Sequence, residues 1–292
     1  MTNMQLPGSL VSTSWLAQHL DDSRVRVVDI RGYVKSELVD DDGRQVATYA
    51  GAPEEYAAGH IPGAVYVDWT RDIVDPSDHV PVQIATPAVF AEAMESRGIG
   101  DDSAVVIADH AGGHFATRLW WALKYYGHDN VAILDGGYKA WTDELRPLST
   151  DVPSVPPTTF TPRTRPEMVV DAGQVLKAID DSSTRIIDAR DARTFYGEVY
   201  RGSRRGHIPG AESTPVAQFH DNAGLWRSAD ELRSIFESQR ISSDERVIAY
   251  CNGGVTATAV LFALDQAGFT NYANYDGSWN EWGERPELPV EP

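Results

Sequence analysis

The chain of 292 residues has little cysteine, little lysine and no long apolar runs. Its one cysteine, Cys251, cannot form a disulfide within the chain, which excludes any mechanism that needs two thiols in one molecule. A single unpaired thiol is typical of a reducing cytosol. No stretch approaches the roughly 18 consecutive apolar residues of a membrane span, and residues 1–10 lack the pattern of a signal peptide. These absences predict a cytoplasmic protein without a membrane partner.

Basic residues are also scarce, since 25 Lys and Arg stand against 43 Asp and Glu and give a net charge of −18. This charge repels phosphates and so excludes nucleic acid as a partner. Only four of the basic residues are Lys. The acidity is typical of a well-solvated surface. A small anionic substrate would therefore need a local group of Arg side chains to attract it.

An internal repeat organises the chain. Four segments of the first half recur in the second half in the same order: 27–31 with 186–190, 59–64 with 206–211, 106–113 with 247–254, and 134–141 with 275–282. The last two pairs share an offset of 141 residues, so no gap separates them. The earlier offsets of 159 and 147 place an extra loop of 12 residues within the range 33–49 of the first half. Two copies of one fold explain this pattern.

Six prolines between Pro147 and Pro166 mark the boundary between the copies. Proline excludes helix and central strand, so this segment is expected to be a semi-rigid extended linker. The predicted domains are residues 1–146 and 167–292, with the linker at 147–166. Each is long enough to bury its own core.

Short apolar strands alternate with helical segments in each half. We expect strands at residues 24–30, 104–108 and 131–134, and helices at 86–97 and 117–126, with Thr86 as N-cap and Pro87 as the first helical residue. This alternation predicts an α/β fold around a parallel sheet. Ligand sites of such sheets lie at the carboxyl ends of the strands.

Cys251 stands at such a strand end. Gly253 and Gly254 follow it, and then a helix-forming stretch covers residues 256–267. Backbone N–H groups and the helix dipole stabilise an anion there, which favours a thiolate. The alternative is a small buried apolar residue, as most free cysteines are. The glycines and the strand–turn–helix context favour a functional thiol.

Histidines occupy several repeated positions. Gap-free alignment puts His110 opposite Cys251, so the first half cannot perform nucleophilic sulfur chemistry. We expect His110 to pack or to form hydrogen bonds at the domain interface; a catalytic role is the less favoured alternative. His60 and His207 lie in identical Gly-His-Ile-Pro-Gly-Ala boxes, and we expect each to brace its turn. No spacing of His, Cys and carboxylates predicts a metal site, and no cofactor is expected.

Together these motifs resemble the tandem-domain rhodanese family of thiosulfate and 3-mercaptopyruvate sulfurtransferases. The resemblance covers about residues 10–288, and it rests on Asp188-x-Arg190, both Gly-His-Ile-Pro-Gly-Ala boxes, Cys251-x-x-Gly-Val-Thr-Ala, and Asp-Gly-Ser-Trp at 276–279. It implies two rhodanese-like domains, each with a five-stranded parallel sheet flanked by helices. It also implies a non-catalytic N-terminal domain, a catalytic C-terminal domain and an active site between them.

The implied mechanism is a covalent sulfur transfer. Cys251 takes the outer sulfur of a small anionic donor, becomes a persulfide, and passes that sulfur to cyanide or a thiol. Backbone N–H groups of the following loop would hold the anionic sulfur. The loop consists of Asn252, Gly253, Gly254, Val255 and Thr256. We expect the two glycines to supply left-handed dihedrals, and Thr256 either to donate its hydroxyl to the thiolate or to cap the helix.

The donor remains open between thiosulfate and 3-mercaptopyruvate. Thiosulfate-preferring relatives resemble Cys-Arg-Lys-Gly in this loop, and mercaptopyruvate relatives resemble Cys-Gly-Ser-Gly or Cys-Gly-Thr-Gly, whereas this chain has Cys251-Asn-Gly-Gly. Thr194 stands where the family places a donor-binding Arg. We predict that Arg193 and Arg204 bind the donor and that Arg190 forms a structural ion pair. The alternative is a solvated arginine-rich loop.

The loop around Cys251 also bears on two other functions, a phosphatase and a persulfide carrier. A phosphatase with the Cys-x5-Arg motif is rejected, because the sixth residue after Cys251 is Ala257. A persulfide carrier or redox-sensing module for a protein partner remains the alternative to an enzyme, because both need the same loop.

Overall fold

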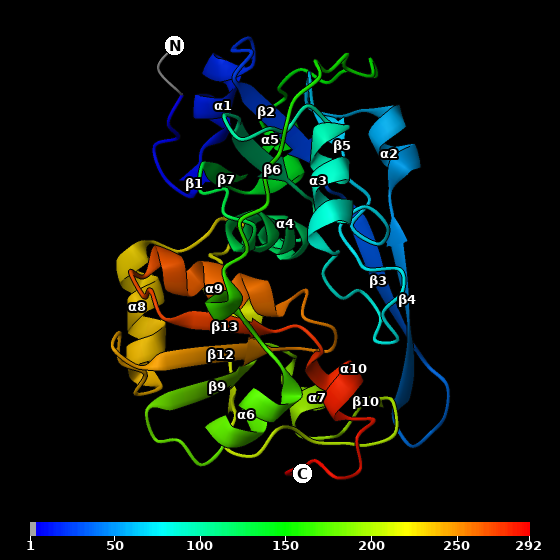
Figure 1. Cartoon of the computed structure of the whole chain (residues 1–292), viewed down its shortest axis with the longest axis vertical. Coiled ribbons are helices and arrows are strands. Elements are labelled where there is room, and N and C mark those ends of the chain that lie inside the picture. The colour runs from blue at the N-terminus through cyan, green and yellow to red at the C-terminus, as the bar shows by residue number, and fades with distance from the viewer. Residues whose placement is uncertain (1–3) are drawn as a thin grey trace.

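Two parallel five-stranded sheets form the centres of the two halves of this computed structural model, which describes residues 4–292 (Figure 1). The first sheet has the order β1 (Leu10–Val11), β7 (Val131–Leu134), β6 (Ala104–Ala108), β2 (Val25–Asp29) and β5 (Val65–Tyr66). The second has the order β8 (Val169–Val170), β13 (Tyr272–Tyr275), β12 (Arg246–Tyr250), β9 (Thr184–Asp188) and β11 (Glu212–Ser213). Matched by repeat, the two orders are the same. The predicted fold class is confirmed. Residues 1–3, part of the segment analysed for a signal peptide, lie outside the described residues.

Helices cover both sheets, and each half contributes five of them to the described residues. The first half has α1 (Thr13–His19), α2 (Pro53–Ala58), α3 (Pro87–Glu95), α4 (His114–Tyr125) and α5 (Gly137–Asp143). The second has α6 (Ala172–Ala178), α7 (Ala192–Phe195), α8 (Ala229–Ser238), α9 (Ala257–Gln266) and α10 (Ser278–Trp282), with 3₁₀ turns η1 (Pro166–Met168) and η2 (Val216–Phe219). No helix within residues 4–292 is long and apolar enough to cross a membrane.

The predicted helices occur, with shifted ends. Pro87 is the first residue of α3, as expected, but the Thr86 side chain makes no capping hydrogen bond. Helix α4 begins at His114, three residues before the predicted start, because Gly113 adopts a left-handed φ of 85° and turns the chain into the helix early. This early start places His114 on the first turn of α4.

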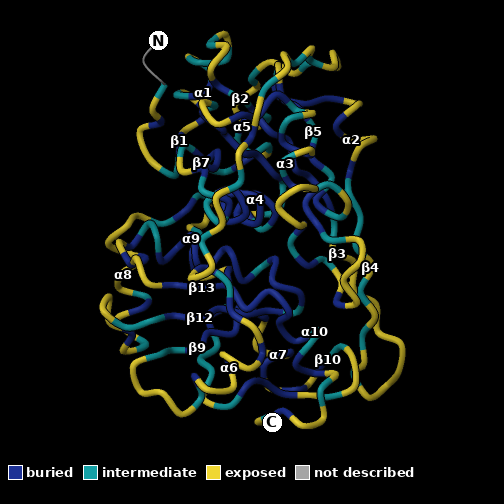
Figure 2. The backbone as a smooth tube through the Cα atoms, viewed as in Figure 1, coloured by how far each residue is buried: buried dark blue, intermediate teal, exposed yellow. Residues whose placement is uncertain are grey.

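Helices α4 and α9 pack against each other between the two sheets (Figure 1). Most of α4 and most of α9 are buried, in the dark centre of Figure 2. A helix that is apolar on every side belongs in a core. One continuous hydrophobic cluster accordingly runs from the first sheet through both helices to the second. The two halves are therefore fixed relative to each other.

The inserted segment of the first half is a β-hairpin, and the prediction of an extra loop is wrong in this respect. Strands β3 (Gly32–Leu38) and β4 (Arg44–Gly51) pair antiparallel, with Val34 opposite Tyr49. Strand β4 also pairs in parallel with β10 (Tyr200–Arg201) of the second half. The hairpin therefore crosses between the domains along one side of the molecule (Figure 1) and carries aromatic residues to the second domain.

The proline-rich segment is extended, with no helix or strand between residues 150 and 165. It is nevertheless tied down along its length. Phe160 is buried, and the amides of Arg163 and Arg165 donate to the carbonyls of Tyr126 and Tyr125 over 2.8 Å and 2.9 Å. The linker therefore acts as a fixed strap along the first domain.

Candidate active site

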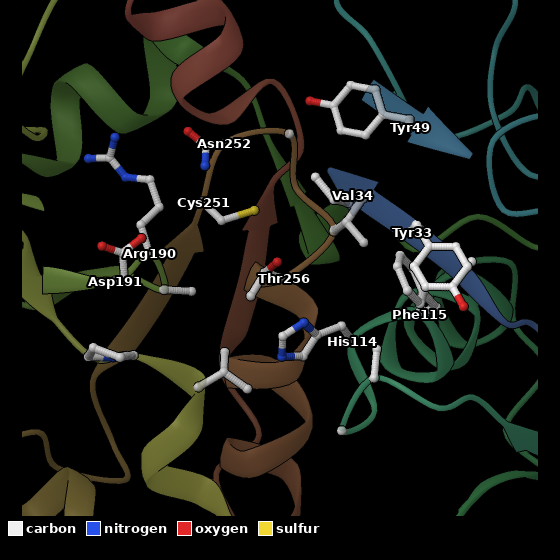
Figure 3. Close-up of a pocket in the computed structure, with 18 of the residues that line it drawn as sticks. Tyr33, Val34, Tyr49, His114, Phe115, Arg190, Asp191, Cys251, Asn252 and Thr256 are labelled. Atoms are coloured by element: carbon white, nitrogen blue, oxygen red, sulfur yellow. The ribbon is translucent and has the colours of Figure 1, made fainter. Parts of the chain in front are cut away.

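Cys251 follows the last residue of β12, is 4% exposed, and lines a cavity of about 550 Å³ between the domains. The Cys251 loop, residues 251–256, forms one wall, and the opposite wall comes from the first half (Figure 3). Tyr33, Val34 and Tyr49 of the crossing hairpin face the cavity there. The carboxyl end of a parallel strand therefore provides the site, as the sequence predicts.

The beginning of α10 holds the loop in place. The Cys251 amide donates to the Ser278 hydroxyl oxygen (3.0 Å), and that hydroxyl donates to the carbonyl of Tyr275 (2.7 Å). The amides of Trp279 and Asn280 donate to the carbonyls of Cys251 and Asn252. Ser278 adopts a left-handed φ of 49°, a strained conformation for a residue with a Cβ. The closing Asp-Gly-Ser-Trp motif thus fixes the backbone of Cys251.

The loop presents its backbone amides without acceptors. Within the described part of the chain, none of the amides of residues 252–256 donates to a protein atom. Gly254 has a φ of 72°, and a Cβ there would lie 2.5 Å from the Asp276 carboxylate. Gly253 does not have a positive φ, so the prediction that both glycines are left-handed is wrong for it. Gly253 is needed because a Cβ would lie 2.9 Å from Val82.

The corresponding loop of the first half contains an internal anion. The Asp109 carboxylate accepts hydrogen bonds of 2.9–3.1 Å from four loop amides, those of Ala111, Gly113, Phe115 and Ala116. The repeat position of Asp109 in the second half is Tyr250, whose hydroxyl instead accepts from the Ile208 amide (3.0 Å). The corresponding loop therefore binds a carboxylate in the first half and leaves its amides without a protein acceptor in the second.

Thr256 lines the cavity, and its side chain makes no capping hydrogen bond to α9. Of the two roles left open by the sequence, the structure therefore removes helix capping. Figure 3 shows the Thr256 side chain on the same wall as the Cys251 sulfur.

The arginines of the second half have separate positions. Arg190 forms a buried ion pair with Asp188 (2.6 Å), as predicted, and in Figure 3 its guanidinium points away from the sulfur. Arg193 is two-thirds exposed and pairs with Glu198 (3.2 Å). Arg204 donates to four backbone carbonyls, including that of Leu288 (2.7 Å). The structure does not bring the predicted donor-binding residues Arg193 and Arg204 to the cavity that Cys251 lines.

Arg201 is the arginine that the sequence did not single out. It lines the Cys251 cavity, has a buried Nε without an acceptor, and pairs with no carboxylate among residues 4–292. Strand β10 holds it through pairing with the crossing hairpin. Its only sequence signal is membership of the arginine-rich stretch, because its placement depends on the other domain.

The histidines divide into two groups. His60 and His207 brace their turns as expected, with Nδ1 bonded to the carbonyls of Tyr56 (2.8 Å) and Phe195 (3.1 Å). By contrast, His110, His114 and His220 all line the cavity. No group of three or more His, Cys, Asp or Glu within residues 4–292 is arranged to hold a metal ion.

Reciprocal contacts hold the cavity walls together. Arg118 of α4 forms a buried ion pair with Asp276, and the Ile84 amide donates to the same carboxylate (2.8 Å). In the other direction, the Trp226 amide of the second half donates to Asp135 (3.0 Å). Each half therefore anchors a loop on the Asp-Gly motif of the other. The cavity depends on both domains.

Comparison with known proteins gives consistent matches over the whole chain. The model of the rhodanese-like domain matches residues 12–144 and 171–285. The chain is similar to the 3-mercaptopyruvate sulfurtransferase of Escherichia coli K12, at 37% identity over 97% of each chain. It is similar to the sulfur carrier protein TtuD of Thermus thermophilus, at 33% identity over 97% of this chain and 96% of that one. The crystal structure of the 3-mercaptopyruvate sulfotransferase SseA from Escherichia coli matches with a TM-score of 0.80 and 34% identity, over 93% of this chain and 99% of that one.

Proposed function

The chain belongs to the rhodanese family, and we propose that this sulfurtransferase moves sulfur from 3-mercaptopyruvate to cyanide or a thiol through a persulfide on Cys251. The observation that carries the proposal is the position of the Cys251 sulfur beside loop amides that have no protein acceptor. Such amides stabilise a thiolate before the reaction and an anionic persulfide after it. The internal carboxylate of Asp109 in the repeated loop supports this affinity for anions.

The donor step balances without a cofactor. The Cys251 thiolate attacks the sulfur of 3-mercaptopyruvate, and an S–S bond forms. The C–S bond breaks, and its electron pair leaves on carbon as the enolate of pyruvate. The thiol proton of the donor passes to that carbon, which completes pyruvate and leaves an anionic persulfide on the protein. The loop amides and the hydroxyl of Thr256 are the donors available to that anion.

Charge supports 3-mercaptopyruvate over thiosulfate. The Cys251 loop carries no cationic side chain, and the guanidinium of Arg190 forms an ion pair with Asp188. Arg201 is then the cation of the cavity lining that pairs with no carboxylate among residues 4–292; one of its terminal nitrogens donates to the Ser36 hydroxyl, and its buried Nε has no acceptor. One guanidinium matches one carboxylate through a bidentate contact, whereas the thiosulfate dianion would need a second positive charge. The similarity to the E. coli 3-mercaptopyruvate sulfurtransferase supports the same choice.

Parallel assays with the two donors test this proposal. We expect a higher kcat/KM with 3-mercaptopyruvate than with thiosulfate when sulfur transfer to cyanide is followed. Intact mass after donor treatment should show one added sulfur atom, which Cys251→Ser should lack. No turnover with either donor, or full activity of Cys251→Ser, contradicts the proposal.

Two arginine variants identify the donor-binding residue. Arg201→Met should raise KM for 3-mercaptopyruvate by about tenfold or more, since a charge-assisted hydrogen bond contributes about 1.5–3 kcal/mol. Arg193→Met should leave KM unchanged if the cavity arginine binds the donor. The reverse result would restore the prediction made from the sequence. Arg227→Met, which removes an exposed ion pair with Glu231, is the surface control.

A persulfide carrier for a protein partner is the second candidate, because the chain is similar to a sulfur carrier protein. The unpaired Cys251 supports a reducing compartment such as the cytoplasm for either role. The two roles differ in release. An enzyme discharges its persulfide to small acceptors over many turnovers, whereas a carrier keeps it until a specific protein is added.

A further inference from the structure

Three histidines of the cavity wall, His110, His114 and His220, have no assigned role in donor chemistry. We propose that this histidine cluster is the subsite for a thiol acceptor, and that His114 is the base that removes the acceptor's S–H proton. This inference rests on the proposed function, because the Cys251 persulfide is its electrophile.

The cluster is built across the domain interface. His110 precedes α4 and His114 is its first residue, while His220 follows η2 of the second half. All three line the cavity that contains Cys251. In Figure 3 the His114 imidazole extends from the first half toward the wall that carries Thr256 and Cys251. A molecule that approaches the sulfur through this cavity therefore passes imidazole groups.

Unsatisfied nitrogens distinguish two of these histidines, His110 and His220, from the turn-bracing His60. His60 uses both ring nitrogens, on the carbonyls of Tyr56 (2.8 Å) and Asp151 (3.1 Å). In the cluster, Nδ1 of His110 and Nε2 of His220 are buried without a partner. The same cavity contains two more unpartnered buried atoms, Oδ1 of Asn252 and Nε of Arg201. Buried polar atoms normally have partners, so this concentration indicates a polar ligand.

Burial keeps the base neutral. The pKa of His114 is lowered, first by burial and further by the neighbouring His220, against an opposing effect of Asp109. Burial is also the main cause of the lowered pKa of His220. A neutral imidazole at neutral pH accepts a proton, whereas an imidazolium does not. The other titratable or charged residues that line the cavity are Tyr33, Tyr49, Arg190, Asp191, Arg201 and Cys251.

The acceptor step then balances as follows. The imidazole of His114 takes the S–H proton of the acceptor, and the resulting thiolate attacks the terminal sulfur of the anionic Cys251 persulfide. A new S–S bond forms between the acceptor and that sulfur. The old S–S bond breaks, and its electron pair leaves on Cys251 as a thiolate. The products are an acceptor persulfide, free Cys251 and an imidazolium, which releases its proton to water.

Single-turnover discharge tests the role of His114. The protein is loaded with 3-mercaptopyruvate and freed of donor, and the persulfide is verified by intact mass. It is then mixed either with glutathione or with sulfite. Sulfite, used at pH 8, is an acceptor that is already an anion and needs no base. We expect His114→Asn to slow discharge to glutathione at pH 7 by about a hundredfold, within the usual range for a general base. Loading and discharge to sulfite should be unchanged.

The pH profile separates a base from a structural residue. Wild-type discharge to glutathione should stay constant above the pKa of His114 and fall below it. In His114→Asn the rate should follow the thiolate fraction of the acceptor, which is one half at about pH 8.5 and rises further above it. His220→Asn removes a neighbour that lowers the His114 pKa, so the fall in rate should move to higher pH. Added imidazole should restore part of the rate to His114→Ala.

A control variant and three contrary results complete the test of the acceptor subsite. His79→Asn, an exposed histidine beside Asp78, should match the wild type in every assay. If His114→Asn slows persulfide discharge to glutathione and to sulfite equally, or leaves the pH profile of discharge to glutathione unchanged, the acceptor subsite alone is overturned. If His114→Asn does not fold, an unshifted profile in His220→Asn overturns it. A wild-type protein that takes up no sulfur overturns both proposals.

Discussion

Thr117 and Thr258, both buried between the domains, share a hydrogen bond of 2.9 Å between their hydroxyls and lie 141 residues apart. That separation equals the offset between the repeated sequences, so the two residues are repeat mates that touch each other. Lys124 and Asp265, also 141 residues apart, form an ion pair of 2.7 Å. The pseudo-twofold relation of the duplication therefore passes between α4 and α9. The contact between these two helices lies at the centre of the molecule.

Coupling between the two threonines can be measured directly. Thr117→Val and Thr258→Val should each cost about 1 kcal/mol of the free energy of unfolding, and the double variant should cost less than their sum, because the hydrogen bond is lost only once. Urea denaturation provides the double-mutant cycle. Thr142→Val, whose hydroxyl bonds within its own helix, should add to Thr117→Val without coupling. Strict additivity for the first pair contradicts a shared bond.

Asp109 should be a major determinant of stability. Asp109→Ala leaves four amides of the first-half loop without their acceptor. Each unsatisfied buried donor costs about 1–3 kcal/mol, so we expect a loss of at least about 3 kcal/mol in urea denaturation. Asp143→Ala, which removes an exposed partner of Lys139, should change stability by less than about 0.5 kcal/mol. Equal effects of the two substitutions would sink this account of the loop.

The buried ion pair between the domains should be costly to break on one side only. Arg118→Met leaves Asp276 buried and uncompensated, which typically costs about 3–5 kcal/mol. Arg118→Met combined with Asp276→Asn should recover part of that loss. The exposed pair of Arg165 and Asp129 provides the matched control, and Arg165→Met should cost about 1 kcal/mol or less. A single variant that is as stable as the double variant contradicts a role for charge.

Ser278 combines a strained backbone with two hydrogen bonds. Ser278→Ala keeps the left-handed conformation and loses both bonds, whereas Ser278→Gly loses the bonds but relieves the strain. We expect Ser278→Ala to be less stable than Ser278→Gly by about 1 kcal/mol. Both should lower kcat by roughly tenfold with little change in KM, a barrier increase of about 1.4 kcal/mol. Ser238→Ala on α8 is the control, and a KM effect alone would reject a positioning role.

Stability should fall as the pH drops below neutrality. The pKa values of His114, His128 and His220 are all lowered, chiefly by burial. Between their lowered values and the ordinary value of about 6.5, the unfolded chain binds protons that the folded chain does not, so stability rises with pH. Urea denaturation at pH 7.5 and 5.5 should show the loss. His128→Gln, remote from the cavity, should reduce the dependence of the free energy of unfolding on pH. An unchanged dependence contradicts an origin in the buried histidines.

Much of the fold follows from local pattern. The repeated segments, the short β-branched strands and the proline-rich linker reflect backbone preferences that act within a few residues. Cys251 could be predicted as a functional thiol for the same reason, since a strand end, a Gly-rich turn and a helix N-terminus adjoin it in the chain. The hairpin form of the inserted segment could not be predicted in this way, because the sheet of β3 and β4 includes a third strand, β10, from the other half.

The cavity walls required the tertiary structure. Arg193 and Arg204 have the residue type expected for anion binding, but the fold directs them to Glu198 and to the C-terminal backbone. Arg201 and the histidine cluster line the same cavity as Cys251 because α4 and α9 pack together and the hairpin crosses the interface. The sequence by itself determined the two copies of the fold and the position of the candidate nucleophile at a strand end, since both depend on short-range order along the chain. Only the docking of one copy on the other decided which side chains face the sulfur, because burial and charge at an interface depend on residues distant in sequence.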